Sequence, residues 1–372
     1  MNDVKGYYIM IKHFLVVICM MWSSAHALTP TDISNIKESI VFIGVYGEKD
    51  VPKQLGSGFF ISASGMIVTN YHVIHKANEI RVWKYGDFTF YHAIVVGADP
   101  LADLALLQIA IPANTSDESY ELVKKNPFPF LRFQTEPERL VTGVDVWAFG
   151  NPMSNRFVTT KGIITTDAIP GFLSPFVRQI VHDAVLNNGS SGGPLLTADG
   201  KVAGVNTYIM SPDGNYSGLG AATRADTVLI SVRRMIESNY IEKQEPIKYP
   251  ALDILFVELD DMGTNDMLQS QYENQIIPNT FGIMVRGIAE DGHSYKQGLR
   301  DFDTIIAING KPTNDRMELA DALLGNDVAD NVVITIIRRG VFMNINFLLT
   351  YSKFDYNAYY DKDNTPKGMP TR

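Results

Sequence analysis

The sequence predicts a mainly β protein with two folded units, and three observations carry this prediction. Short β-branched runs separated by Gly, Asn and Asp follow one another from residue 39 to residue 206 with almost no helical period, which is typical of a barrel or a sandwich. The length of 372 residues exceeds what one hydrophobic core usually takes. A second series of strands, with one helix, begins after residue 250. We therefore expect a β-rich unit followed by a smaller α+β unit.

The expected strands of the first unit are nine short runs, at 39–44, 58–62, 66–69, 79–83, 93–96, 104–109, 144–149, 162–166 and 201–206. The unit should close with a helix, because five apolar residues recur at helical spacing and share one face: Val228, Leu229, Val232, Met235 and Ile236. The second unit alternates strands with a helix at 316–324, and its strands are expected at 282–286, 303–308, 332–337 and 343–347. These runs predict where each element lies, but not how the elements pair.

The boundaries follow from composition. We predict a signal peptide at 1–27, a first domain at 33–238, a linker at 239–250, a second domain at 251–350 and a polar, Tyr-rich tail at 351–372 that we expect to be disordered. The linker is assigned because this stretch is rich in Lys, Glu and Pro and poor in apolar residues.

The overall composition excludes some classes of protein. Apolar residues make up 45% of the chain, which is enough for packed cores. Acidic side chains outnumber basic ones by 41 to 32, and the formal charge of −9 argues against nucleic acid as a partner, because that binding relies on clustered Lys and Arg. The single cysteine, Cys19, can form no internal disulfide and leaves no cysteine set for zinc. We expect no metal and no cofactor.

The N-terminus has the layout of a secretory signal. Lys12 precedes an apolar run from Phe14 to Trp22, and small residues follow up to Ala27, after which we predict cleavage. Cleavage would remove Cys19, and an exported chain without cysteine fits a bacterial periplasm. An uncleaved inner-membrane anchor facing the periplasm is the alternative, although the apolar run is much shorter than the roughly 20 residues that cross a bilayer.

Three segments together suggest nucleophilic catalysis, which needs a nucleophile, a base, an acid that orients the base, and donors for an oxyanion. Ser191 lies in a Gly-rich turn that could aim the N–H groups of Gly189 and Ser191 at one point, as an oxyanion hole requires. His72 ends a strand and could act as the base. Asp103 opens the apolar strand at 104–109 and could orient His72. Each feature alone is weak evidence for catalysis, but all three occur in one β-rich unit.

Two other residues compete for these roles. Asp99 lies four residues before Asp103, but only Asp103 adjoins the apolar strand. His182 and Asp183 lie close to the serine loop in the sequence, yet neighbours on a strand point to opposite faces and could not both serve one site.

Together these motifs resemble the HtrA/Deg family of chymotrypsin-fold serine proteases. The resemblance rests on Gly56-Ser-Gly-Phe-Phe-Ile-Ser62, Thr69-Asn-Tyr-His-Val-Ile74, Asp103-Leu-Ala-Leu-Leu107, Ala148-Phe-Gly-Asn-Pro152 and Gly189-Ser-Ser-Gly-Gly-Pro-Leu195. The segment Gly298-Leu-Arg-Asp-Phe-Asp-Thr-Ile-Ile-Ala-Ile-Asn-Gly310 resembles the PDZ domain of these proteases. The resemblance implies a double six-stranded β-barrel of chymotrypsin type followed by an α+β PDZ-like domain. It also implies His72 as general base, Asp103 as its orienter and Ser191 as nucleophile.

The resemblance further implies a homotrimer and a PDZ unit that binds peptide C-termini. The family loop that grips the carboxylate contains a Leu-Gly pair, and its nearest match here has Asp253 in place of Gly; the predicted loop residues are Tyr249, Pro250, Ala251 and Leu252. For trimer contacts the sequence offers Val41 and Phe42, which could equally belong to the core. Ser190 stands where the family usually has Asn, and the loop after Pro152 lacks the usual Gly.

The predicted substrate pocket contains Val185 and Leu186. Val185 lies six positions before Ser191, where proteases that cut after Lys or Arg carry an acid. Without that acid a buried cation would be unpaired, so we expect cleavage after Val, Leu, Ile or Ala. The leading hypothesis is an exported endopeptidase for unfolded or misfolded envelope proteins; the alternative is a proteolytically idle chaperone or scaffold.

Overall fold

The computed structural model describes residues 27–47, 51–110, 127–151, 157–171, 174, 176–210, 218–259 and 282–351. Residues 1–26 of the predicted signal peptide, residues 352–372 of the predicted tail, and the loop that follows Asn151 lie outside these ranges. Among the helices that the structure does describe, none is both long and apolar enough to cross a membrane.

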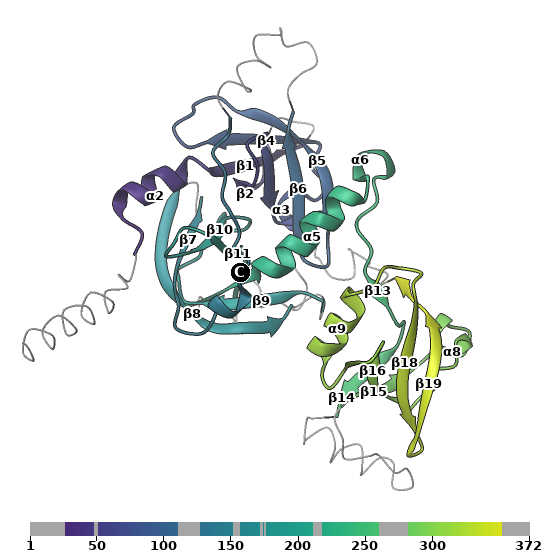
Figure 1. Cartoon of the computed structure of the whole chain (residues 1–372). Helices are drawn as coiled ribbons and strands as arrows, with labels where there is room; N and C mark the ends of the chain where they lie inside the picture. The colour runs from purple at the N-terminus through teal and green to yellow at the C-terminus, as the bar shows by residue number, and fades with distance from the viewer. Residues whose placement is uncertain are drawn as a thin grey trace, which may run out of the picture.

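The first barrel is a closed antiparallel sheet in the order β1-β2-β3-β6-β5-β4 (Figure 1). Its strands are β1 (Ile40–Tyr46), β2 (Pro52–Phe60), β3 (Met66–Thr69), β4 (Glu79–Lys84), β5 (Tyr91–Asp99) and β6 (Leu104–Ile109). All six were predicted from β-branched runs. Val41 is fully buried and Phe42 is 6% exposed, so both belong to the core and not to an exposed contact surface.

The second barrel closes in the order β10-β11-β12-β9-β8-β7. Its strands are β7 (Asp145–Gly150), β8 (Val158–Pro170), β9 (Arg178–His182), β10 (Pro194–Thr197), β11 (Val202–Met210) and β12 (Leu219–Arg224). Strands β9, β10 and β12 were not predicted, because they are short or contain Gly, Ala and Pro in place of β-branched residues. Their strand character comes from closing the barrel, and the predicted double six-stranded fold is confirmed.

Helix α5 (Ala225–Glu237) follows the second barrel and packs against β5 and β6 of the first barrel and β11 and β12 of the second (Figure 1). Val228, Val232 and Met235 are buried as predicted. Leu229 and Ile236 are not on that buried face, since they are 36% and 57% exposed.

Helix α2 (Pro30–Lys37) was not predicted; Thr29 and Asp32 form its capping box. The remaining short helices of this unit are α3 (Tyr71–Ile74), η1 (Pro137–Arg139) and α6 (Tyr240–Lys243).

The C-terminal unit is built on a six-stranded sheet with the order β14-β15-β16-β18-β19, to which β17 adds by pairing with β16. The strands are β14 (Leu255–Glu258), β15 (Ile283–Gly287), β16 (Thr304–Ile308), β17 (Lys311–Pro312), β18 (Asn331–Arg338) and β19 (Val341–Leu348). Helices α8 (His293–Lys296) and α9 (Arg316–Leu324) complete it, and β13 (Pro250–Ala251) pairs with β20 (Thr350–Tyr351). Strand β14 ends the sheet order, so its outer side is an edge among the strands that the structure describes.

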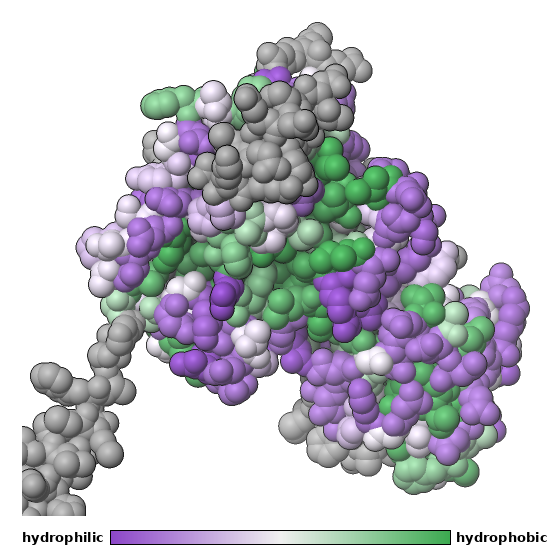
Figure 2. All heavy atoms as spheres, turned by 45° about the horizontal axis from the view of Figure 1, so that its top comes forward, coloured by the Kyte–Doolittle hydropathy of each residue, from purple (hydrophilic) through white to green (hydrophobic). Residues whose placement is uncertain are grey.

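The predicted linker packs against the protease-like unit. Its last residues, Ile247 and Tyr249, are 9% and 1% exposed, and the N–H of Ile247 donates to the carbonyl of Ala98 at 3.0 Å. One cluster of buried apolar side chains includes Leu104 of β6, Met235 of α5, Tyr249 and Ile305 of β16. On the face that Figure 2 shows, apolar surface gathers on the barrels, whereas the C-terminal unit is mainly polar.

Candidate active site

His72 and Asp103 lie together in the first barrel, as predicted. The Nδ1 atom of His72 is 2.6 Å from Oδ2 of Asp103, and the backbone N–H of His72 donates to Oδ1 at 2.8 Å. The side chains are 13% and 5% exposed, respectively. Helix α3 carries His72 and the turn before β6 carries Asp103, so two connections of the same barrel meet here. The carboxylate fixes both the ring and the backbone of the histidine.

The backbone of Asp103 is held as firmly as its side chain. Its φ of 52° lies in the left-handed region, which Asp tolerates better than most residues. Its carbonyl accepts from the side-chain amide of Asn70 at 2.8 Å and from the N–H of Tyr71 at 3.1 Å. Asn70 is fully buried. The segment just before His72 thus holds Asp103 by its backbone while His72 contacts its carboxylate.

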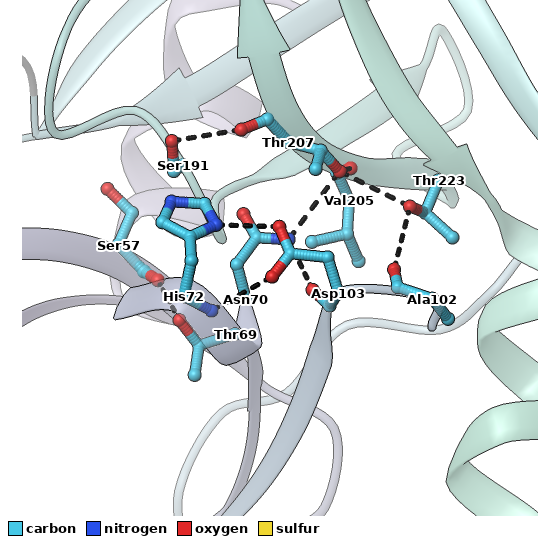
Figure 3. A network of polar contacts seen from close by, with 10 residues as sticks. All are labelled: Ser57, Thr69, Asn70, His72, Ala102, Asp103, Ser191, Val205, Thr207 and Thr223. Carbon is cyan, nitrogen blue, oxygen red and sulfur yellow. Dashed lines mark hydrogen bonds and ion pairs between the residues drawn. The ribbon is translucent and has the colours of Figure 1, made fainter. Parts of the chain in front are cut away.

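Ser191 comes from the second barrel, in the loop before β10. Figure 3 shows the imidazole of His72 between the Asp103 carboxylate and the Ser191 side chain. The hydroxyl of Ser191 donates to the carbonyl of Thr207 at 3.1 Å, so it is turned away from a hydrogen bond with His72. In the structure the three predicted residues come together in one site, with the Ser191 hydroxyl bonded to Thr207 and not to His72.

The loop around Ser191 leaves two backbone donors free. Ser190 donates its N–H to Asn187, and Gly192 to Asn206, but the N–H groups of Gly189 and Ser191 have no acceptor among the residues that the structure describes. Gly189 has a φ of 97°, which favours glycine. Gly192 has a φ of 85°, and a Cβ there would come within 2.1 Å of the carbonyl oxygen of Ser57. The glycines therefore permit both the turn and its close contact with β2.

Ser57 and Asn151 support this loop, although no role was predicted for either of them. The hydroxyl of Ser57 donates to the carbonyl of Gly189 at 2.6 Å and accepts from the backbone N–H of Asn151 at 2.9 Å. The side-chain amide of Asn151 also donates to it and to the carbonyl of Val41. Both residues occur in the quoted motifs, but only their contacts across the two barrels reveal what they do.

The two predicted pocket residues face different surroundings. Val185 is 45% exposed, and its carbonyl accepts from the hydroxyl of Thr160 at 2.9 Å. Leu186 is 4% exposed and packs against the bare backbone of Gly220, where a Cβ would meet it at 2.6 Å. No acidic residue lies between this pair and Ser191 in the chain. Both side chains near the loop are apolar.

The competing residues do not join the site. His182 is fully buried, whereas the exposed Asp183 accepts from the N–H of Ile163, so the two neighbours face opposite ways as predicted. Burial lowers the pKa of His182 to about 4, although Asn206 and Asp183 oppose the effect. Burial also raises the pKa of the Asp99 carboxyl, which contacts Ser231, Tyr249 and Ala102 and does not contact His72. Asp103, and not Asp99, is the partner of His72.

The predicted peptide loop of the C-terminal unit starts from a buried residue. The hydroxyl of Tyr249 donates to Asp99 of the first barrel, so that side chain is already engaged. Pro250 and Ala251 form β13, and Leu252 is 4% exposed. Asp253, where the family has Gly, is exposed with a φ of 52°. The side chain of Tyr249 cannot contact a ligand in this arrangement, and peptide binding by the loop stays a prediction.

Comparison with known proteins agrees with the two units. The trypsin-like peptidase domain family matches residues 56–205, and the PDZ domain family matches residues 250–349. A probable periplasmic serine endoprotease DegP-like from Rickettsia conorii is 33% identical over 297 residues, which cover 78% of this chain and 52% of the relative. The periplasmic serine endoprotease DegP of Escherichia coli is 28% identical over 312 residues, covering 82% of this chain and 59% of DegP.

The solved structures give the same fold. The HtrA-type protease AlgW, solved with a tripeptide, superposes with a TM-score of 0.70 at 24% identity and covers 87% of this chain and 99% of its own. A serine endoprotease from Yersinia pestis gives a TM-score of 0.63 at 22% identity, with 87% of this chain and 100% of its own covered. The chain spans about half to three fifths of the length of the curated relatives it matches. With its trypsin-like peptidase domain followed by a PDZ domain, the chain belongs to the HtrA/Deg family.

Proposed function

We propose that this protein is an exported serine endopeptidase that cleaves unfolded or misfolded envelope proteins after small or medium apolar residues. The observation that carries the proposal is the His72–Asp103 hydrogen bond of 2.6 Å beside Ser191, in a loop with two backbone donors that lack an acceptor among the described residues. The domain boundaries belong to the same proposal: a protease domain at 33–238, a linker at 239–250 and a PDZ-like domain at 251–350.

The reaction would use each group in a defined order. His72 takes the proton of the Ser191 hydroxyl through Nε2, because Nδ1 is held by Asp103. The serine oxygen attacks the peptide carbonyl, and the N–H groups of Gly189 and Ser191 stabilise the oxyanion. The imidazolium then gives its proton to the leaving amine, and an acyl-enzyme remains. Water, deprotonated by His72, attacks the ester and restores the serine.

The apolar side chains of Val185 and Leu186 support the proposed substrate preference. A Lys or Arg side chain beside them would lose hydration without gaining an ionic partner. An apolar side chain would instead gain the burial free energy, which is about 0.8 kcal/mol for each CH₂ group. We therefore propose that residues such as Val, Leu, Ile or Ala precede the cleaved bond.

The C-terminal unit is proposed to bind the C-termini of peptides along β14, whose outer side is an edge of the sheet. An extended peptide can add to such an edge as a further strand.

We also propose a periplasmic location and a homotrimer. Exposed aromatic side chains on the connection between β4 and β5 support contacts with other chains, since Phe88 is 98% exposed and Tyr85 is 41% exposed.

Labelling with a fluorophosphonate tests the proposal directly. The wild-type chain should react at Ser191 and degrade casein, whereas Ser191→Ala should show neither activity, because the nucleophile is absent. Peptides with Val and with Lys before the cleaved bond should differ in kcat/KM by more than tenfold. Equal labelling of wild type and Ser191→Ala would refute the proposed chemistry.

A second candidate function is an idle protease fold that acts as a chaperone or scaffold. The observation in its favour is the hydrogen bond from the Ser191 hydroxyl to the carbonyl of Thr207, which leaves His72 without the serine proton. Such a protein would suppress the aggregation of an unfolded client equally well with Ser191 or Ala at this position. Casein cleavage by the wild type, absent in Ser191→Ala, would exclude this candidate.

A further inference from the structure

The turn that presents Asp103 to His72 is closed by a buried carboxylate, that of Asp99. This residue ends β5, and its Oδ1 accepts from the N–H of Ala102 at 3.1 Å. The N–H of Asp103 in turn donates to the carbonyl of Pro100 at 3.3 Å. Residues 99–103 therefore form a compact turn, and the left-handed backbone of Asp103 is its last member. Asp99 therefore braces the turn that carries Asp103, through its bond to Ala102.

The second oxygen of Asp99 accepts from two hydroxyl groups. Ser231 of α5 donates to Oδ2 at 2.6 Å, and Tyr249 donates to the same atom at 2.5 Å. Asp99 and Ser231 are fully buried, and Tyr249 is 1% exposed. With the N–H of Ala102, the carboxylate accepts from three donors, which oppose the burial that raises its pKa. Burial makes each of these bonds costly to lose, because a buried acceptor cannot find water instead.

Tyr249 is the donor that lies outside the barrels and α5. It directly precedes residues 250–349, which match the PDZ domain family. Its ring stacks on Phe176, with centroids 5.4 Å apart and planes 13° apart, and the guanidinium of Arg234 lies 5.4 Å from its centroid. Arg234 also donates to the carbonyls of Leu324 and Asn326 in the C-terminal unit. The tyrosine is therefore fixed where the protease and PDZ units meet.

We infer that Tyr249 is a positioning residue for the catalytic carboxylate, and that it acts through Asp99 on the turn that carries Asp103. The inference rests on the proposed protease function. It assigns to a residue at the end of the linker, directly before the PDZ domain, a part in the geometry of the catalytic centre. Because Tyr249 is buried, it contributes nothing to substrate contact; its effect falls on the orientation of His72.

The test compares Tyr249→Phe with wild type in the full chain. Phenylalanine keeps the ring on Phe176 and removes only the hydroxyl. We expect kcat for a short peptide with Val before the cleaved bond, and the rate of fluorophosphonate labelling, to fall about fivefold, as expected for one lost hydrogen bond to a carboxylate. KM should stay within about twofold, because no substrate contact changes. The proton NMR signal of the Nδ1–H that His72 shares with Asp103 should shift upfield.

Two further variants keep the test decisive. Tyr91→Phe is the matched control, since its hydroxyl donates to the carboxylate of Asp87 at 3.4 Å in the same barrel, and it should leave kcat and the NMR signal unchanged. Ser231→Ala removes the other hydroxyl from Oδ2 of Asp99 and should reproduce the loss of kcat even where Tyr249→Phe folds poorly. A wild-type kcat and an unmoved proton signal in both Tyr249→Phe and Ser231→Ala would overturn the inference. A wild type that fails to label would instead overturn the protease function.

Discussion

Two aspartates in different regions share a φ of 52°, and their surroundings differ sharply. Asp103, in the candidate active site, has its carbonyl held by Asn70 and Tyr71 and its carboxylate held by His72. Asp253, at the predicted peptide loop, is exposed, and its side chain has no hydrogen-bond or ion-pair partner among the residues that the structure describes. The same backbone conformation is accompanied by several hydrogen bonds at Asp103 and by no side-chain hydrogen bond at Asp253 among the described residues.

The difference shows how a strained backbone serves a site. A left-handed non-glycine residue costs roughly 1–2 kcal/mol, less for Asp, and this cost persists only where the surroundings impose the conformation. Around Asp103 the bonds supply that constraint and aim the carboxylate at the histidine. At Asp253 the conformation follows the loop, and the carboxylate has no partner in the described part of the chain. We therefore expect substitutions at the two positions to have opposite effects.

The largest effect is expected at Asp103. Asp103→Asn retains the size of the side chain. The carboxylate accepts from Nδ1–H of His72, whereas the amide N–H of Asn can donate to Nδ1 and so favours the tautomer with its proton on Nε2. We expect kcat for a peptide substrate to fall about 10⁴-fold, as measured by initial rates at saturating peptide.

Asp253→Asn is the control with the same chemical change at the same φ. It should keep kcat within twofold of wild type, because no catalytic group depends on its carboxylate. Comparable losses in the two variants would show that the aspartates do not differ in the way their contacts indicate.

The second largest effect is expected on the pH dependence of stability, and it follows from comparing a histidine that has a hydrogen-bond partner with one that has none among the described residues. His72 is held by Asp103, whereas His182 is fully buried with neither ring nitrogen hydrogen-bonded in the described part of the chain. Burial lowers its pKa to about 4 from an ordinary value of 6.5. Below pH 6.5 the unfolded chain takes up a proton that the folded chain refuses until about pH 4. Stability should therefore fall as the pH decreases across this range, by on the order of 3 kcal/mol.

Urea unfolding at pH 7 and pH 4.5 measures this loss. His182→Leu should unfold with a weaker dependence on pH than wild type, because leucine has no proton to gain. His92→Gln, at a side chain that is 54% exposed, should retain the wild-type dependence. A dependence that is unchanged in His182→Leu would contradict the assignment of acid sensitivity to this residue.

The meeting of His72, Asp103 and Ser191 was easier to predict from the sequence than the groups that support them. His72, Asp103 and Ser191 each adjoin a strand end in a motif, so their meeting followed from a fold in which those ends converge. Ser57 and Asn151 acquire their role only when β2 and β7 pack across the two barrels, and no local pattern encodes that contact. The burial of Tyr249 was missed for the same reason, since a polar stretch with two prolines is typical of a linker and its hydroxyl finds Asp99 only in the folded chain.

The smallest expected effect is at Asp253, and it tests the peptide loop. A peptide carboxylate bound close to this loop would be repelled by the exposed Asp253 side chain, and two charges about 4 Å apart in water interact by about 1 kcal/mol. Asp253→Asn should therefore tighten the binding of a labelled peptide with a free, apolar C-terminus about fivefold, as measured by fluorescence anisotropy.

Asp253→Gly separates charge from conformation. It removes the same charge and also the cost of the left-handed backbone, so it should bind the peptide at least as tightly as Asp253→Asn. A peptide with an amidated C-terminus should gain nothing from either substitution, because it carries no charge for Asp253 to repel. Equal gains for the free and the amidated peptide would mean that the loop does not recognise a carboxylate, and the peptide would then be held by the edge of β14 alone.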